Sequence, residues 1–210
     1  MTKPTSGNDQ PAPVKYQPMP KGLAQLFTGL SEQRYGINLH AHRFAAWAAS
    51  RAASVVNCRF SVAQGRSILE ECGFDSMSLS PERLPEPQVV DEAHRKWRAD
   101  IISAAASCDL TFTHGVAAKL VNVYLKSRFV CGGHHDNERV RALHPPIDSV
   151  LLETLADLNV GGHAKEWSQA SKTRWSKFGS EDYEHVIALI RQSLGDRPLW
   201  LIEEYWRGNQ

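Results

Sequence analysis

The sequence has none of the features that mark membrane, secreted or polybasic proteins. It contains no run of about 18 apolar residues, so no segment is expected to span a bilayer. Its first residues lack the charged and then apolar pattern of a secretory signal. The net charge of +1 excludes a histone-like protein but leaves room for a basic patch on one face. We therefore expect a cytoplasmic protein without membrane contact.

Cysteine is scarce, and its spacing argues against a disulfide framework. No two of the four cysteines form a Cys-x-x-Cys pair, and they are spread over the chain at Cys58, Cys72, Cys108 and Cys131. A secreted chain held together by disulfides has a denser pattern, so we expect four reduced thiols.

Side chains of the types that bind zinc gather in one polar loop. Cys131 and His134 form a Cys-x-x-His pattern, which is followed by His135, Asp136 and His144. A zinc site needs a second ligand pair at a defined spacing, and this loop has none. We predict no bound metal and no cofactor. A solvated loop and a contact with phosphate both remain open for these side chains.

Apolar residues recur at helical rather than strand spacing. No stretch alternates apolar and polar residues over the length of a strand, whereas intervals of three and four are common. With 210 residues, 42% of them hydrophobic, the chain can bury one sizeable core. The predicted fold is an all-α, single-domain array of about eight or nine helices. The main helices are expected at 38–58, 61–72, 88–107, 116–130, 148–158, 181–194 and 198–206.

Capping residues and apolar faces support these bounds. Asn38 is a predicted N-cap and Gly73 a predicted C-cap. Trp47 and Trp97 fall among the apolar residues of their helices, so we predict that both pack in the core.

The first residues differ in composition from the rest. Residues 1–20 are rich in proline, serine, threonine and glutamine, and they have almost no large aliphatic side chains. Such a segment buries too little apolar surface to offset the entropy of ordering. We predict a disordered tail at 1–20, a short helical stripe soon after it, and one helical domain over 21–210.

Two charged residues stand near the starts of two apolar helices. Lys119 lies in the first turn of the helix predicted at 116–130, and Asp148 follows Pro145-Pro146 at the start of the next one. The helix N-terminus and apolar neighbours both disfavour a charged amine, so the pKa of Lys119 is predicted to lie below its usual value. An aspartate at an N-cap accepts backbone N–H bonds and stays ionised.

These two groups suit the cleavage of a glycosidic bond. A neutral amine attacks a sugar C1′ or condenses with a carbonyl to a Schiff base, and a carboxylate stabilises an oxocarbenium-like sugar. Two structural interpretations remain open: Lys119 extends to solvent, and Asp148 is only a helix cap. Lys126, seven positions along nearly the same face, is a second candidate amine.

The same segment resembles a known family. Gly115-Val116-Ala117-Ala118-Lys119 is similar to the hairpin-to-helix junction of the 8-oxoguanine DNA glycosylases, in the helix-hairpin-helix superfamily, where a Gly-Val-Gly-x-Lys run carries the Schiff-base lysine. Pro146-Ile147-Asp148 is similar to that group's Pro-Val-Asp segment, whose aspartate is catalytic. The 29 positions from Lys119 to Asp148 are closer to its archaeal branch. The segments 42–49 and 199–206 are similar to the ends of a bacterial set of small proteins with this fold.

The resemblance implies a DNA N-glycosylase and AP lyase of helix-hairpin-helix fold, with Lys119 and Asp148 as catalytic residues. Its substrate would be an oxidised purine of the 8-oxoguanine type, in DNA or in a modified nucleotide, and the protein would be a monomer. We also predict substrate contacts from His114, Gly115, Asn122, His144, Tyr205 and Trp206. The hairpin departs from the family pattern, because Ala117 replaces its second glycine and Thr113-His114 replace Leu-Pro. A weaker contact with DNA phosphate is expected there.

Two other functions fit the same residues. One is a nucleic-acid or nucleotide binding module of this fold without lyase chemistry. The other is a protein-interaction module, for example one that takes part in bacterial phage defence. Tyr205 and Trp206 either stack on an extruded base or pack in the core. The stretch 165–177, in which basic residues alternate with tryptophans, is either a nucleic-acid contact or a solvated loop.

Overall fold

The computed structural model describes residues 35–208, and the regular elements of this part of the chain are helices, as predicted. Nine α-helices are joined by short 3-10 and π-helical turns within that range. The extended structure found there is one isolated bridge between Val55 and Cys58. The predicted tail at 1–20 and the helical stripe that follows it lie outside the described residues.

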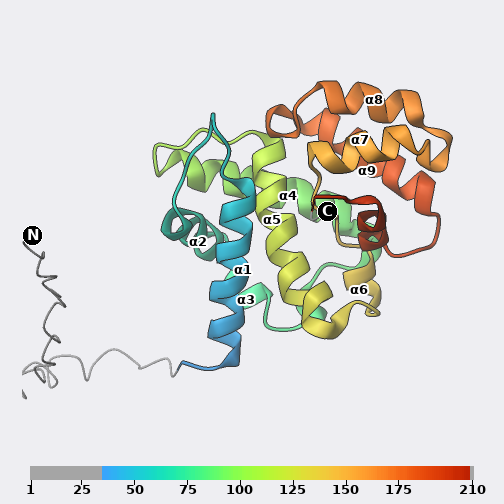
Figure 1. Cartoon of the computed structure of the whole chain (residues 1–210). Helices are drawn as coiled ribbons and strands as arrows, with labels where there is room; N and C mark the ends of the chain where they lie inside the picture. The colour runs from blue at the N-terminus through green and yellow to red at the C-terminus, as the bar shows by residue number, and fades with distance from the viewer. Residues whose placement is uncertain (1–34, 209–210) are drawn as a thin grey trace, which may run out of the picture. The chain divides into compact units, whose positions relative to one another are not determined.

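The helices follow one another in the order shown in Figure 1. The α-helices are α1 (Ile37–Ala53), α2 (Val62–Glu71), α3 (Phe74–Met77), α4 (Val90–Ala106), α5 (His114–Leu125), α6 (Glu138–Arg141), α7 (Ser149–Asp157), α8 (Ala164–Lys172) and α9 (Ser180–Leu194). The shorter turns are η2 (Pro81–Arg83), η3 (Pro87–Val89), η4 (Lys126–His134), η5 (Val160–Gly162), η6 (Trp175–Lys177) and η7 (Leu199–Tyr205). Between residues 35 and 208, no helix combines the length and the apolar character needed to cross a bilayer.

Local capping explains why several predicted helices agree with the structure. Ser61 and Gln64 form a capping box at the start of α2, and Gly73 follows the helix with a left-handed φ of 76°. Asp148 is the N-cap of α7 through a hydrogen bond from the Leu151 amide. The predicted bounds at 61–72, 148–158 and 181–194 are confirmed to within one residue at each end.

The first helix differs from its prediction. Gly36, not Asn38, is the N-cap of α1, and the helix ends at Ala53. Its buried face consists mainly of alanines, which allow close packing on α5, while the side chain of Trp47 is 50% exposed. The prediction that Trp47 packs in the core is wrong for this reason. Trp97 does pack against the core, with its ring centroid 5.7 Å from that of Phe74.

The buried side chains form two clusters, and α5 contributes to both. One cluster lies among α1, α2, α4 and α5, and the other is built mainly from α7, α8 and α9. Ten of the twelve residues of α5 are buried. Ala118 belongs to the second cluster, whereas Ala117 and Leu120 belong to the first. The neighbouring Lys119 therefore enters a protein interior rather than a solvated face.

The stretch 165–177 is not the loop that its polar sequence allows. It contains most of α8, whose Trp167 is fully buried and donates its indole N–H to the Val160 carbonyl at 2.9 Å. Trp167 is therefore a core residue and cannot stack on a nucleic-acid base. Trp175, in η6, lies instead against the lysine that the sequence singles out.

Candidate active site

Lys119 is placed by the start of α5. Thr113 is the N-cap, because its side chain accepts a hydrogen bond from the Val116 amide at 3.1 Å. Since the helix begins at His114, Lys119 is its sixth residue and not part of the first turn. The predicted effect of the helix dipole is thereby reduced, because it fades beyond the first turn.

The Lys119 amine and the Asp148 carboxylate are in direct contact. The amine donates to Asp148 Oδ2 at 3.1 Å and to the Ile147 carbonyl oxygen at 3.0 Å. Its nitrogen also lies 5.4 Å from the centre of the Trp175 ring. Lys119 is only 7% exposed, so it does not extend to solvent. The structural alternative of a solvated lysine is excluded.

Asp148 serves two neighbours besides Lys119. Oδ1 accepts the Leu151 amide at 2.9 Å, which caps α7, and Oδ2 also accepts the indole N–H of Trp206 at 3.0 Å. All three donors are N–H groups, and the carboxylate accepts from each of them. They orient it toward the amine, because one oxygen is engaged by the helix and the other is shared by Lys119 and Trp206.

The electrostatics of Lys119 are dominated by burial. Loss of hydration lowers the pKa of the amine below its usual range, and the adjacent Asp148 opposes this shift. Glu203 acts in the same direction as Asp148, whereas Lys126 adds a small lowering effect. A lowered pKa makes the neutral, nucleophilic form of the amine more accessible.

The space beside the amine is narrow. A cavity of about 170 Å³ adjoins Lys119, and no part of it is wide enough to hold a water molecule. Its walls come from α5, η6, α9 and the segment before α7, namely Gly115, Ala118, Asn122, Ile147, Trp175, Phe178 and Tyr183. A sugar cannot reach the amine unless neighbouring side chains move.

Gly115 is explained by a close approach of two backbone segments. Its amide donates to the Phe178 carbonyl at 3.1 Å, and a Cβ at this position would lie 1.8 Å from the Trp175 carbonyl oxygen. The Thr113 hydroxyl donates to the Ser176 carbonyl, at 2.9 Å, in the same segment. The Gly115 amide is therefore engaged within the protein and has no hydrogen free for a DNA phosphate.

Replacing Gly115 by alanine is expected to destabilise the fold. The new methyl group would collide with backbone rather than with a flexible side chain, so residues 175–178 must shift. We expect a loss of about 3 kcal/mol in unfolding free energy by urea denaturation. Gly132→Ala is the control, because the nearest atom to its added Cβ would be 3.9 Å away. Equal stability of the two variants would contradict this account of Gly115.

A chain of buried polar side chains lies next to the Lys119 cavity. Asn122 Nδ2 donates to the Pro145 carbonyl and to the Tyr183 hydroxyl, both at 2.9 Å. Tyr183 is 3.1 Å from His144 Nδ1. His144 Nε2 is 2.7 Å from Asp91. Asn122 and His144, predicted to contact substrate, are thus buried and bonded to protein groups.

The chemistry of these partners fixes where the hydrogens lie. A carboxylate only accepts, so His144 Nε2 carries the hydrogen given to Asp91, and Nδ1 accepts from Tyr183. A carbonyl also only accepts, so the Asn122 amide must turn its nitrogen to Pro145. Asn122 Oδ1 then accepts from His94 Nε2 at 2.7 Å. Both imidazoles are neutral in this arrangement.

Stability is expected to fall in mild acid because of these histidines. Burial lowers the pKa of His94 and of His144 below the usual 6.5. Below pH 6.5 the unfolded chain binds protons that the folded chain excludes, so folding loses free energy as the pH falls. We expect a loss of up to about 1.4 kcal/mol per histidine per pH unit. Urea unfolding at pH 7.5 and 5.5 measures it, and equal stability at both values would contradict the neutral network.

The remaining predicted contact residues lie at the edges of the site. His114 is partly exposed, and burial lowers the pKa of its imidazole. Tyr205 packs partly against the second cluster, and Trp206 is 37% exposed while bonded to Asp148. Lys126, the second candidate amine, pairs with Glu203 and does not contact Asp148 through any recorded bond. Trp206 thus bonds to the same Asp148 oxygen as Lys119, whereas Lys126 pairs with Glu203 instead.

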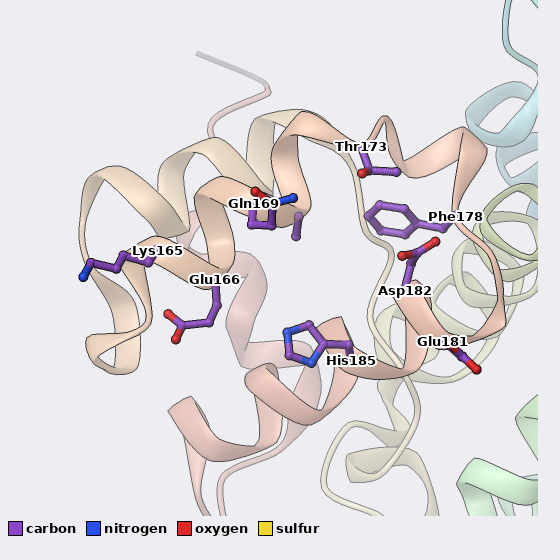
Figure 2. A pocket seen from close by; sticks show the side chains of 9 residues that line it. Lys165, Glu166, Gln169, Thr173, Phe178, Glu181, Asp182 and His185 are labelled. Atoms are coloured by element: carbon purple, nitrogen blue, oxygen red, sulfur yellow. The ribbon is translucent and has the colours of Figure 1, made fainter.

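A larger hollow lies between α8 and α9, and no motif in the sequence predicts it. Figure 2 shows Glu166 from α8 and His185 from α9 directed into this space, with Gln169 and Phe178 also on its walls. Its volume is about 460 Å³. Phe178 also lines the small cavity beside Lys119, so the two spaces share one wall residue.

The polar loop after α5 holds no ligand set for a metal. Among residues 35–208, no three histidine, cysteine or acidic side chains come together as ligands. Cys131 is exposed, and all four cysteines, which lie within this range, are free thiols.

No protein-family model matches this chain, and no curated protein or solved structure matches it either. The chemistry of Lys119 and Asp148 must therefore be inferred from the residues themselves and from the motif that contains them.

Proposed function

We propose that the protein is a DNA N-glycosylase with AP lyase activity of the helix-hairpin-helix, 8-oxoguanine glycosylase type. The observation that carries the proposal is the contact between a buried amine, Lys119, and the N-cap carboxylate of Asp148 at 3.1 Å. The two residues occupy the positions that the family motif gives to its nucleophile and its aspartate. The helix α5 that bears the lysine follows α4 through a short connection, as that motif requires.

The proposed reaction begins with an oxidised purine nucleotide extruded from DNA. The neutral Lys119 amine attacks C1′, and the base leaves with the electron pair of the glycosidic bond and takes up a proton. Asp148 stabilises the positive charge on the sugar and accepts the proton that the lysine ammonium gives up. Asp148 returns this proton to O4′ as the C1′–O4′ bond breaks, which opens the sugar ring and leaves an imine between Lys119 and C1′. Loss of a proton from C2′ to solvent then expels the 3′ phosphate by β-elimination.

Substrate entry requires the narrow cavity beside Lys119 to widen. Trp206 and Trp175 both border the amine or its carboxylate partner, and Trp206 is partly exposed. Displacement of Trp206 would free Asp148 Oδ2 from its indole bond and expose the pair to a sugar. An aromatic ring that leaves the carboxylate is then available to stack on the extruded base.

Borohydride trapping tests the proposal. The protein is incubated with duplex and single-stranded DNA that contain 8-oxoguanine, and with matched DNA that contains guanine. Borohydride delivers hydride to the imine carbon and fixes the protein to the DNA as a secondary amine. We expect an adduct with the oxidised DNA and little with the guanine control. Absence of an adduct with every DNA rules out the lyase function.

A nucleic-acid binding module without chemistry is the second candidate. The narrowness of the cavity and the internal use of the Gly115 amide favour it, because a sugar does not fit beside the amine and the Gly115 amide is already bonded. Binding of labelled DNA that is unchanged in Lys119→Ala, and that weakens steeply with salt, would support this candidate over the first.

A further inference from the structure

Two sets of contacts join α5 to the chain segment that precedes α7. Lys119 holds the Ile147 carbonyl and the Asp148 carboxylate, and one helical turn later Asn122 holds the Pro145 carbonyl at 2.9 Å. The segment 143–147 is buried along its whole length. The second contact therefore fixes the backbone whose last residues form the first.

The Asn122 side chain is itself fixed by a hydrogen bond to Tyr183. Tyr183 on α9 accepts from it and donates to His144, which belongs to the same buried segment. His144 in turn donates to Asp91, whose carboxylate is held by Arg191 at 2.7 Å. Side chains of α4, α5 and α9 thus converge on residues 144–145, three to four positions before Asp148.

We infer that Asn122, Tyr183 and His144 are positioning residues that set the Asp148 carboxylate and the Ile147 carbonyl against the Lys119 amine. This role rests on the proposed lyase function of Lys119. None of the three contacts the amine through a hydrogen bond, but Asn122 and Tyr183 line the cavity beside it. They act by holding the segment in place and by keeping water out of that cavity.

Removal of the Tyr183 hydroxyl is the most selective way to disturb these hydrogen bonds. Tyr183→Phe keeps the ring and its stacking on His94 but removes one partner each from Asn122 and His144. Asn122 keeps its bond to Pro145 but loses the group that fixes its orientation. We expect residues 144–148 to loosen and water to enter the cavity.

Tyr124→Phe is a matched control. Tyr124 is also fully buried, and it lies on α5 with Lys119. Its hydroxyl also bonds a histidine, His42 at 2.7 Å, and it contacts Ser78 at 2.9 Å. It belongs to the first cluster, away from the Lys119 cavity. Each variant therefore loses a buried hydroxyl with a histidine partner, and only one loss lies beside the pair.

The experiment compares the intact wild type and both variants by thermal melting, by borohydride trapping and by ¹⁵N NMR titration of lysine side chains. Both variants are expected to lose similar stability. Only Tyr183→Phe is expected to slow trapping, by about tenfold, because a displaced reacting group lowers the rate steeply. It should also raise the pKa of the Lys119 amine, because burial is the main cause of its lowered value.

Two results overturn the inference: an unchanged Lys119 titration in Tyr183→Phe, or the same change in Tyr124→Phe. The NMR titration decides between them without any DNA. If wild type gives no adduct, the lyase proposal fails by itself, while a shifted Lys119 titration in Tyr183→Phe alone still supports the positioning of the amine. Asn122→Leu, which removes the donor to Pro145 without adding a charge, is expected to shift it in a second, independent variant.

Discussion

Replacement of Lys119 by methionine is expected to abolish the adduct between the protein and DNA that contains 8-oxoguanine. Methionine has a side chain of similar length but no amine, so no bond to C1′ can form. The expected fall in trapping is roughly a thousandfold or more, the range seen when a covalent nucleophile is removed. The quantity of adduct after borohydride treatment, read on a denaturing gel, measures the effect.

Lys126→Met is the control for this experiment. Lys126 is the first residue of η4, directly after α5, and is paired with the Glu203 carboxylate, so it is also a lysine in an ion pair. It makes no recorded bond to Asp148, and the adduct is expected to persist at close to the wild-type level. Loss of the adduct in Lys126→Met, with retention in Lys119→Met, would mean that the nucleophile has been assigned to the wrong lysine.

The second large effect is expected for Asp148→Asn. Asparagine caps a helix about as well as aspartate, so the hydrogen bond from the Leu151 amide and the stability that the cap contributes are retained. The negative charge beside the amine is lost, together with its ability to stabilise a positive sugar or accept a proton. We expect trapping to slow by roughly 10²-fold or more.

Asp148→Ala separates the two roles of this residue. It removes both the cap and the charge, so it should slow trapping as much as Asp148→Asn and in addition lower the unfolding free energy by about 1 kcal/mol. Urea denaturation of both variants provides the comparison. Wild-type trapping in Asp148→Asn would show that Asp148 is only a helix cap.

Several elements were predictable because their signals are local. The cap at Ser61, the glycine after α2 and the Asp148 N-cap each depend on a few neighbouring residues. The same holds for the pattern that singled out Lys119 and Asp148, although their contact spans 29 positions. The motif pairs the two residues by their roles, and the structure brings the two side chains together.

Other features depend on neighbours that are distant in the sequence. Trp47 fits an apolar helix face, yet alanines occupy the interface because α1 packs closely on α5. Gly115 resembles a phosphate-binding glycine, yet its missing Cβ accommodates the Trp175 carbonyl 60 positions away. The position of a backbone segment so far along the chain has no signature in the residues around Gly115.

The buried hydrogen bonds of Asn122, Tyr183 and His144 could not be predicted from the sequence either. Asn122 and His144 were expected at the substrate, but their partners come from α4 and α9 and enclose them. One pattern in the sequence does point to such a network. Asp91, His94 and Arg98 recur at intervals of three and four residues in α4, a helix that packs against others. A polar stripe on such a face indicates buried polar partners, although it does not identify them.

The chemistry proposed for Lys119 is tested most directly by locating the site of attachment. The borohydride-fixed adduct of the wild-type protein with 8-oxoguanine DNA is digested with protease and nuclease, and the modified peptide is sequenced by mass spectrometry. We predict a residual sugar mass on Lys119 and on no other lysine. A modification at Lys126 or elsewhere, or no modified peptide at all, would contradict the assignment of Lys119 as the nucleophile.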